Sequence, residues 1–314
     1  MNIPTPVLYA IGAIFGLLAL ATALVWWIGR KRPGEASTEL MLRVRSWWVM
    51  IGVFTVAMVI DRMISTIFLG FIAYLALKEY FSLIPTRRID RLVLLFAYLA
   101  VPIQFYWAHI GWYGMFAVFI PLWMFLFLPM VMVLQGQTEG FLRAVGTVSW
   151  GLMMTVFTLS HTAMMLTEGD VTNGVAGGAG LLLFLVFMTQ FNDVAQFTWG
   201  KLFGKRAIVP SVSPKKTWEG FLGGAISTAC LAALVGPYLT VMPWLWSAAA
   251  GAMIAVAGFI GDVNMSAVKR DLQVKDSGGL IPGHGGILDR VDSLTYAAPI
   301  FLHFFYYFFV GGRI

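Results

Sequence analysis

The chain has 314 residues, of which 59% are hydrophobic and 11% are charged, and its mean hydropathy is +0.82. A soluble domain of this size needs far more charge to cover its surface, so the composition excludes one. The net charge of +6 is explained by basic connections that interact with anionic lipid head groups. It does not indicate nucleic-acid binding, because the sequence has no basic run interleaved with exposed aromatics. Cys230 is the single cysteine, which excludes an intrachain disulfide and a zinc cluster.

Apolar runs of about 20 residues, each long enough to cross the ~30 Å hydrocarbon core as a helix, recur along the chain. They predict an all-α, polytopic integral membrane protein with ten transmembrane helices. The first run is followed by the basic stretch IGRKRPGE, which favours a span over a cleaved signal peptide. Only Asp61 and Arg62 separate the second span from the third, which predicts a tight turn. The predicted spans are 7–28, 47–60, 63–82, 91–108, 113–134, 144–166, 177–197, 218–239, 244–262 and 292–311.

Alternate connections divide the basic residues unequally. With the amino terminus outside, 19 of the 21 lysine and arginine residues fall on one side, and only Arg62 and Arg313 fall on the other. Cytoplasmic connections carry an excess of these residues, so both termini are predicted to be non-cytoplasmic. We expect a protein of a bacterial-type inner (cytoplasmic) membrane, with its active site on the cytoplasmic face.

Two polar connections on the predicted cytoplasmic side, 190–220 and 261–293, together hold 9 of the 21 basic residues and 7 of the 15 acidic ones. Because both connections open from the same face of the membrane, they can converge on one site. We therefore predict an N-terminal transmembrane region, 1–175, and a C-terminal catalytic transmembrane region, 176–314, that carries both connections.

Asp262 ends the ninth predicted span, and Asp289 lies just before the tenth. A carboxylate at this depth is costly unless it is neutralised or paired with a cation. Such oxygen ligands suit Mg²⁺, which uses one or two carboxylates and completes its shell with water and phosphate oxygens. The two aspartates predict a metal site. The simpler interpretation is that each marks a helix end and pairs with a neighbour such as Arg290.

The stretch PGHGG, residues 282–286, lies between these aspartates. Its glycines allow close approach of backbone N–H groups to a ligand, and consecutive amides can form an anion-binding concavity. The anion would be a phosphate, with His284 as a proton donor or hydrogen-bond donor. The simpler interpretation is an irregular turn between two helices.

The first polar connection contains two further candidate groups. Ser213 followed by Pro214 predicts a helix start, and Lys215 and Lys216 at that start would bind phosphate. A capped, basic start of a span is the alternative. Asn192 and Asp193 form a polar pair inside an apolar run, which favours a ligand-facing role. By contrast, we assign the isolated polar residues His161, His303, Asp61 and Glu79 to packing or interfacial anchoring.

The stretch Ser266–Asp292 reads SAVKRDLQVKDSGGLIPGHGGILDRVD. It closely resembles the signature of the phosphatidate cytidylyltransferase (CDP-diglyceride synthetase) family. The upstream segment GKLFGKRAIVPSVSPKKTWEGFLGG and the weaker ALKEYFSL also look like this family, so the resemblance is strong over about 190–300 and faint before that. The matching signature positions are Ser266, Lys269, Arg270, Lys275, Asp276, His284, Gly285, Gly286, Asp289, Arg290 and Asp292.

The resemblance implies a membrane enzyme that joins CTP to phosphatidate, giving CDP-diacylglycerol and pyrophosphate with Mg²⁺, and a second cation is compatible with it. It places metal at Asp262 and Asp289, and we add Asp193 and Asp276 as supporting ligands. We assign catalytic contacts with phosphates to Lys269, Arg270, His284 and Arg290. Substrate binding is assigned to Asn192, Ser213, Lys215, Lys216, Ser266, Lys275, Gly285 and Gly286.

The chain departs from the family in two places. Met265 stands where a glutamate is common, and DVAQF keeps Asp193 but places Gln196 and Phe197 where many members have Ala-Tyr. A CTP-dependent transferase or kinase acting on another lipid phosphate is therefore the nearest alternative. A lipid transporter is the alternative from another class, although transporters bind substrate near the midplane and the charges here lie at one surface. The sequence leaves the oligomeric state open, and a homodimer is compatible with it.

Overall fold

The computed structural model describes residues 4–31, 34–136, 138–274, 276–279 and 285–310. Within these ranges, ten helices are long and apolar enough to cross a membrane, which confirms the predicted polytopic all-α architecture. Seven spans are single helices: α1 (Thr5–Lys31), α2 (Glu35–Ile60), α3 (Arg62–Leu83), α4 (Arg91–Ile110), α9 (Gly177–Phe203), α10 (Trp218–Leu239) and α11 (Trp244–Asp271).

The other three spans contain π-helical segments. The fifth consists of α5 (Tyr113–Val118), η2 (Phe119–Met124) and α6 (Phe125–Leu134); the sixth of α7 (Phe141–Leu152), η3 (Met153–Phe157) and α8 (Thr158–Thr172); and the tenth of α12 (Leu288–Phe305) and η4 (Tyr306–Val310). A short 3₁₀ turn, η1 (Arg88–Asp90), precedes α4. Pro121 lies within η2, where the missing N–H favours a local change in the hydrogen-bond ladder.

The second span begins earlier than predicted. α2 starts at Glu35 rather than near 47, because charged side chains continue the helix instead of ending it. Arg43 and Glu39 form an ion pair of 2.6 Å between residues four apart on this helix. The turn after α2 is as tight as predicted: Asp61 caps α3 by accepting a hydrogen bond of 2.9 Å from the backbone N–H of Met63.

The predicted helix start at Ser213 is wrong. Ser213–Thr217 forms strand β2, which pairs antiparallel with β1 (Ala207–Val209), with Ala207 opposite Thr217 and Val209 opposite Ser213. Helix α10 begins at Trp218, and the Thr217 hydroxyl caps it by accepting from Gly220 N–H at 3.2 Å. Pairing with β1 therefore overrides the local serine–proline signal.

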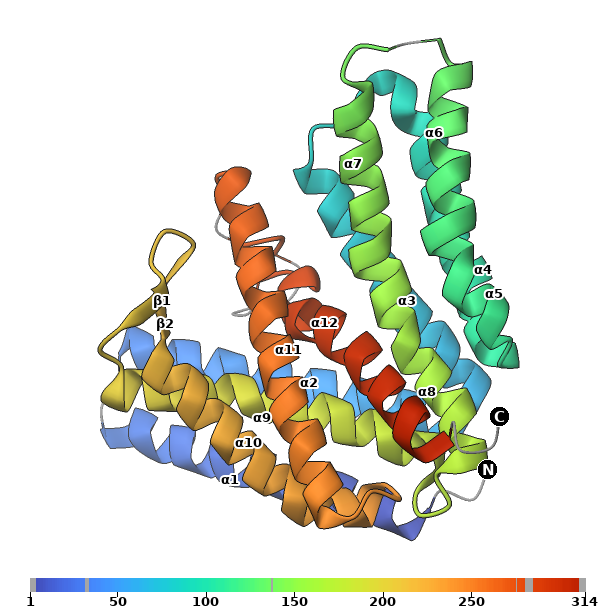
Figure 1. Cartoon of the computed structure of the whole chain (residues 1–314). Helices are drawn as coiled ribbons and strands as arrows, with labels where there is room; N and C mark the ends of the chain where they lie inside the picture. Colours follow the sequence, from blue (N-terminus) through green and yellow to red (C-terminus); the bar gives the residue numbers. More distant parts are fainter. Residues whose placement is uncertain (1–3, 32–33, 137, 275, 280–284, 311–314) are drawn as a thin grey trace.

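Helices α9, α10, α11 and α12 pack against one another in chain order, and α8 contacts both α9 and α12. Phe184 of α9 and Phe301 of α12 are fully buried, with ring centroids 5.5 Å apart. The α1–α2 pair lies at the edge of the bundle, and its side chains are mostly exposed in the way that lipid contact requires. The β1–β2 hairpin and the carboxyl end of α11 lie at the side of the molecule away from the two chain ends (Figure 1).

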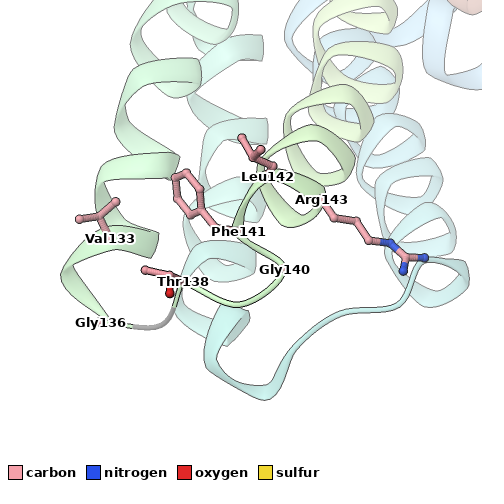
Figure 2. A pocket seen from close by; sticks show the side chains of 7 residues that line it. All are labelled: Val133, Gly136, Thr138, Gly140, Phe141, Leu142 and Arg143. Carbon is pink, nitrogen blue, oxygen red and sulfur yellow. The ribbon is translucent and has the colours of Figure 1, made fainter.

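A hollow of about 470 Å³ lies at the turn between α6 and α7. Figure 2 shows Val133, Thr138 and Phe141 gathered there, whereas Arg143 points away from them. No carboxylate is present among the residues that line the hollow. This lining suits apolar contact rather than phosphate or metal, so the polar residues around α11 and α12 are the better candidate site.

Candidate active site

One face of α11 carries the first part of the site. Asp262, Ser266 and Lys269 are four and three residues apart, a spacing that places them on the same side of a helix. Ser266 Oγ donates to Asp262 Oδ1 at 3.3 Å. The neighbouring Gly261 faces α12 so closely that a Cβ there would overlap the carbonyl oxygen of Asp292. The glycine therefore lets the two helices bring their charged side chains together.

Asp289, in the first turn of α12, is saturated with contacts. Its Oδ1 pairs with Lys269 Nζ at 2.8 Å. Its Oδ2 accepts hydrogen bonds from Ser277 N (2.8 Å), Ser277 Oγ (3.0 Å) and Gly286 N (3.2 Å). The side chain is only 8% exposed, so removal of one partner would leave a buried charge uncompensated.

A second set of carboxylates consists of Asp292, one turn further along α12 than Asp289, with Asp193 of α9 and Asp262 of α11. The charge of Asp262 acts on both Asp193 and Asp292, and those two carboxylates act on each other. Ser293 Oγ lies 3.2 Å from both carboxylate oxygens of Asp193. Like charges that interact in a buried place are stable when one carboxyl group is protonated or when cations lie nearby. Lys216 supplies one, with Nζ 2.5 Å from Asp262 Oδ2, and Arg290 also interacts with Asp193.

The β1–β2 hairpin is fixed to α11 and so carries Lys216 to the carboxylates. Arg270 Nε donates to the carbonyl oxygen of Val212 at 3.2 Å, and the Lys216 ammonium lies 4.7 Å from the ring centroid of Phe259. At the base of the hairpin, Glu219 accepts from the backbone N–H groups of Lys205 (3.0 Å) and Arg206 (3.3 Å). Both predicted polar connections therefore do converge on one place.

Several predicted site residues lie elsewhere or make other contacts. Asn192 is fully buried and joins three helices: its Nδ2 donates to Ala255 O (3.4 Å), and its Oδ1 accepts from Gln196 Nε2 (3.2 Å) and Thr228 Oγ1 (3.3 Å). Its predicted substrate-binding role has no support from these contacts. Lys215 and Asp276 are exposed beside the cluster, and Ser213 begins β2.

Lys275 and His284 lie outside the described residues. Gly285 adopts the left-handed conformation (φ +83°), which favours glycine. Arg290 Nε is buried without a hydrogen-bond partner in the part of the chain that the structure describes. Met265, at the position where a glutamate is common in the family that the sequence resembles, is buried in the hydrophobic core.

Two site residues were missed by the sequence analysis. Glu79 of α3 was assigned to packing or anchoring, but its carboxylate contacts the residues just before α12 and the start of that helix. Asp292 was noted only as part of a signature, yet it is buried beside Asp193 and Asp262. The signal for Glu79 was an acidic residue near the end of an apolar span, on the same predicted side as the polar connections.

The donor set suits a divalent cation chemically, because Asp193, Asp262 and Asp292 offer carboxylate oxygens and Mg²⁺ prefers oxygen ligands. No three carboxylate, imidazole or thiol side chains within the described ranges form a ready-made metal cluster. Mg²⁺ does not require one, since substrate phosphates and water complete its shell. The carboxylates are instead compensated by protein cations, Lys216 at Asp262 and Lys269 at Asp289.

A protein-family model described as the cytidylyltransferase family matches residues 41–308. The chain belongs to the cytidylyltransferase family. The match covers α3 to α12 and both polar connections, so this family's sequence pattern extends well before residue 190, where the resemblance was only faint. Cytidylyl transfer is nucleotidyl transfer, so the predicted enzyme class is confirmed, as is the predicted family.

The family relatives differ in how much of the chain they match. The uncharacterized protein YnbB of Escherichia coli K12 is 42% identical over 298 residues, which are 95% of this chain and 98% of that protein. Phosphatidate cytidylyltransferase of Haemophilus influenzae is 42% identical over 142 residues, 42% of this chain and 47% of that protein. The Mycobacterium bovis enzyme of the same name is 34% identical over 145 residues, 46% of this chain and 47% of the enzyme. The chain thus matches just under half the length of these two enzymes.

Proposed function

We propose that this cytidylyltransferase transfers CMP from CTP to phosphatidate, giving CDP-diacylglycerol and pyrophosphate. One observation carries the proposal: Lys216–Asp262 and Lys269–Asp289 bring two lysines and two carboxylates from separate polar connections together beside α11. Such a group can bind phosphates and a divalent cation at once. We infer the acceptor lipid, phosphatidate, from two partial relatives that are named phosphatidate cytidylyltransferase.

In this reaction a phosphate oxygen of phosphatidate attacks the α-phosphorus of CTP, and the bond from that phosphorus to the oxygen bridging to the β-phosphate breaks. The electron pair of this bond leaves with pyrophosphate. The attacking oxygen is already ionised at neutral pH, so no strong base is needed. The obstacle is repulsion between two anions, which a group of fixed cations reduces.

The chain's own residues provide these cations. Lys216 and Lys269 already lie beside Asp262 and Asp289. Lys215, which directly precedes Lys216 on β2, is exposed. Arg290 has a buried Nε with no hydrogen-bond partner among the described residues, which supports its assignment to a substrate phosphate. Arg270 has a structural role as well, because it donates a hydrogen bond to the carbonyl oxygen of Val212 and so holds the hairpin against α11.

Asp262 and Asp289 would hold Mg²⁺, with Asp193 and Asp276 in support, and the ion would neutralise phosphate charge and orient the triphosphate. Each aspartate now pairs with a lysine, so Lys216 and Lys269 would move from carboxylate to phosphate when substrate enters. A second cation would be held by the group of Asp193, Asp262 and Asp292.

We place this site at the cytoplasmic face of a bacterial-type inner membrane, with both termini on the other side. The support is the excess of basic residues in the connections on the site's side. We retain 176–314 as the catalytic transmembrane region and 1–175 as a divergent N-terminal transmembrane region. A homodimer remains a prediction.

A second candidate is cytidylyl transfer to a different lipid phosphate. Its support is the difference in coverage: the relative that matches 95% of the chain is not a named phosphatidate enzyme, and the named enzymes match 42% and 46% of it. An acceptor other than phosphatidate would leave the nucleotide end of the site unchanged.

Purified protein in detergent tests both candidates. Labelled CTP and Mg²⁺ are supplied with a panel of lipid phosphates, and CDP-lipid and pyrophosphate are measured. Phosphatidate should give the highest kcat/KM, and preference for another lipid phosphate would establish the second candidate. Formation of no CDP-lipid from any acceptor would overturn both and favour transport. Asp271→Asn, on the exposed end of α11, serves as the matched control for the aspartate variants described below.

A further inference from the structure

Glu79, near the carboxyl end of α3, contacts a segment of chain about 200 residues later. Its Oε1 accepts from the backbone N–H of Ile287 at 2.9 Å, and its Oε2 accepts from that of Leu288 at 2.8 Å. Oε2 also accepts from Ser277 Oγ at 3.2 Å. One carboxylate therefore ties the N-terminal part of the bundle to both described sides of the connection between α11 and α12.

These contacts place an anion at the start of α12. The helix has no side-chain cap from its own N-cap residue, Ile287, and the first N–H groups of a helix have no partner within the helix. A carboxylate stabilises this end because the helix dipole is positive there. Glu79 thus fills the position that a bound phosphate would take at a helix amino terminus.

The Glu79 carboxylate leaves little room for a side chain at two neighbouring positions, Gly278 and Gly286. A Cβ on Gly286 would overlap both Glu79 Oε2 and Ser277 Oγ, and a Cβ on Gly278 would lie 3.0 Å from Glu79 Oε1. Gly286 therefore makes room for a protein carboxylate. This contact accounts for Gly286, one of the two glycines that were predicted to bind a substrate phosphate.

Glu79 is also linked to the candidate active site. Ser277 Oγ lies between Glu79 Oε2 (3.2 Å) and Asp289 Oδ2 (3.0 Å), and the backbone N–H of Ser277 donates to the same Asp289 oxygen. Asp289 in turn holds Lys269. A displacement of the Glu79 carboxylate would therefore move Ser277, the start of α12 and the orientation of Asp289.

We propose that Glu79 is a positioning residue: it caps α12 and holds Ser277 so that Asp289 and Lys269 face the reacting phosphates. Glu79 does not touch substrate and acts through Asp289. This inference rests on the proposed cytidylyl transfer for its effect on turnover, but the hydrogen bonds themselves can be tested without that reaction.

Glu79→Gln is the informative variant, because it keeps the shape of the side chain and replaces one acceptor oxygen by an NH₂ group that faces backbone donors. Hydrogen–deuterium exchange of the peptide covering 285–291 should become faster than in the wild type. The kcat for CDP-lipid formation per folded enzyme should fall roughly tenfold to hundredfold, as expected for a misplaced catalytic group. The KM for CTP should change little, and the melting temperature should fall because the start of α12 loses its cap. A merely structural role would lower the melting temperature in the same way but leave kcat per folded enzyme intact.

Two further variants keep the test decisive. Lys78→Gln, at the exposed neighbouring position, should behave as the wild type. Ser277→Ala removes the hydroxyl that lies between Glu79 and Asp289 but leaves the backbone contacts of both carboxylates. It should lower kcat without faster exchange at 287 and 288, and it decides the inference if Glu79→Gln does not fold. Unchanged exchange in Glu79→Gln, or unchanged kcat in both variants, would overturn the inference. An inactive wild type would instead remove the proposed function, and the exchange measurement would still decide whether Glu79 caps α12.

Discussion

Lys216 of β2 and Asp262 of α11 form an ion pair, with Nζ and Oδ2 2.5 Å apart. The lysine side chain is 18% exposed and the aspartate side chain 32%, so the pair lies at the border between interior and solvent. It joins the first polar connection to Asp262, which lies within α11 rather than at its end as predicted, because the helix continues to Asp271. The hairpin therefore has a role in the site that its small size does not suggest.

Lys216→Met keeps the length of the side chain and removes its charge. We expect kcat/KM for CTP to fall roughly ten- to 150-fold, because a hydrogen bond to a charged group contributes about 1.5–3 kcal/mol. The Mg²⁺ concentration for half-maximal activity should also fall, since the ammonium no longer competes for Asp262. Steady-state kinetics at varied CTP and Mg²⁺ measure both effects.

Lys201→Met, on an exposed position of α9, is the control for this variant and should stay within roughly twofold of the wild type. If Lys216→Met leaves both the CTP and the Mg²⁺ dependence unchanged, Lys216 has no part in binding the nucleotide or in compensating Asp262.

Asp289→Asn should abolish turnover, with a loss of at least about 10²-fold. One Asp289 oxygen faces the Lys269 ammonium, and the other accepts from Ser277 and Gly286. In either orientation of an asparagine amide, its NH₂ group would face a donor, so either Lys269 or the connection loses its acceptor. The variant should still insert into membranes and purify as a folded protein.

Turnover per folded Asp289→Asn enzyme is measured after size-exclusion chromatography and compared with that of Asp271→Asn, which should resemble the wild type. Near-normal activity of Asp289→Asn would remove both the metal role and the orienting role of Asp289.

The spans could be predicted from the sequence because length and hydropathy alone decide whether a helix can cross a bilayer. The start of α2 could not, since the Glu39–Arg43 ion pair allows a charged segment to remain helical. Strand β2 was missed for a related reason: Ser213 and Pro214 carry a local helix signal, but the pairing with β1 is a tertiary effect.

The site shows the same limit. Charge density pointed to the two connections that the structure brings together and to Asp262 and Asp289 as candidates, but it could not assign their partners. Glu79 contacts backbone groups about 200 residues away, a relation that no spacing in the sequence encodes. Asn192 was predicted to face a ligand because a polar group in an apolar span needs a partner, and its partners turned out to be Ala255, Gln196 and Thr228.

Removal of divalent cations should stop turnover without unfolding the protein. Lys216 and Lys269 form ion pairs with Asp262 and Asp289, so protein cations can balance these carboxylates. We therefore expect the fold to persist without the ion, in contrast to structural metal sites whose binding energy is folding energy. EDTA should reduce CDP-lipid formation to background, leave the melting temperature unchanged and be reversed by Mg²⁺, while EDTA saturated with Mg²⁺ should have no effect. Full activity in EDTA would refute the metal requirement, and a collapse of the melting temperature would make the ion structural.

Gly261→Ala should destabilise the packing of α11 on α12. An added Cβ would overlap the backbone carbonyl oxygen of Asp292, which cannot rotate away as a side chain could, and overpacking of this kind typically costs about 1–3 kcal/mol. The melting temperature should fall, and turnover should fall with it because Asp262 and Asp292 are pushed apart. Gly52→Ala is the matched control, since a Cβ there meets nothing within 4 Å and alanine is the better helix former; its melting temperature should be unchanged or slightly higher. Equal melting temperatures for the two variants would show that the close approach of α11 to α12 at Gly261 is not needed to hold the carboxylates together.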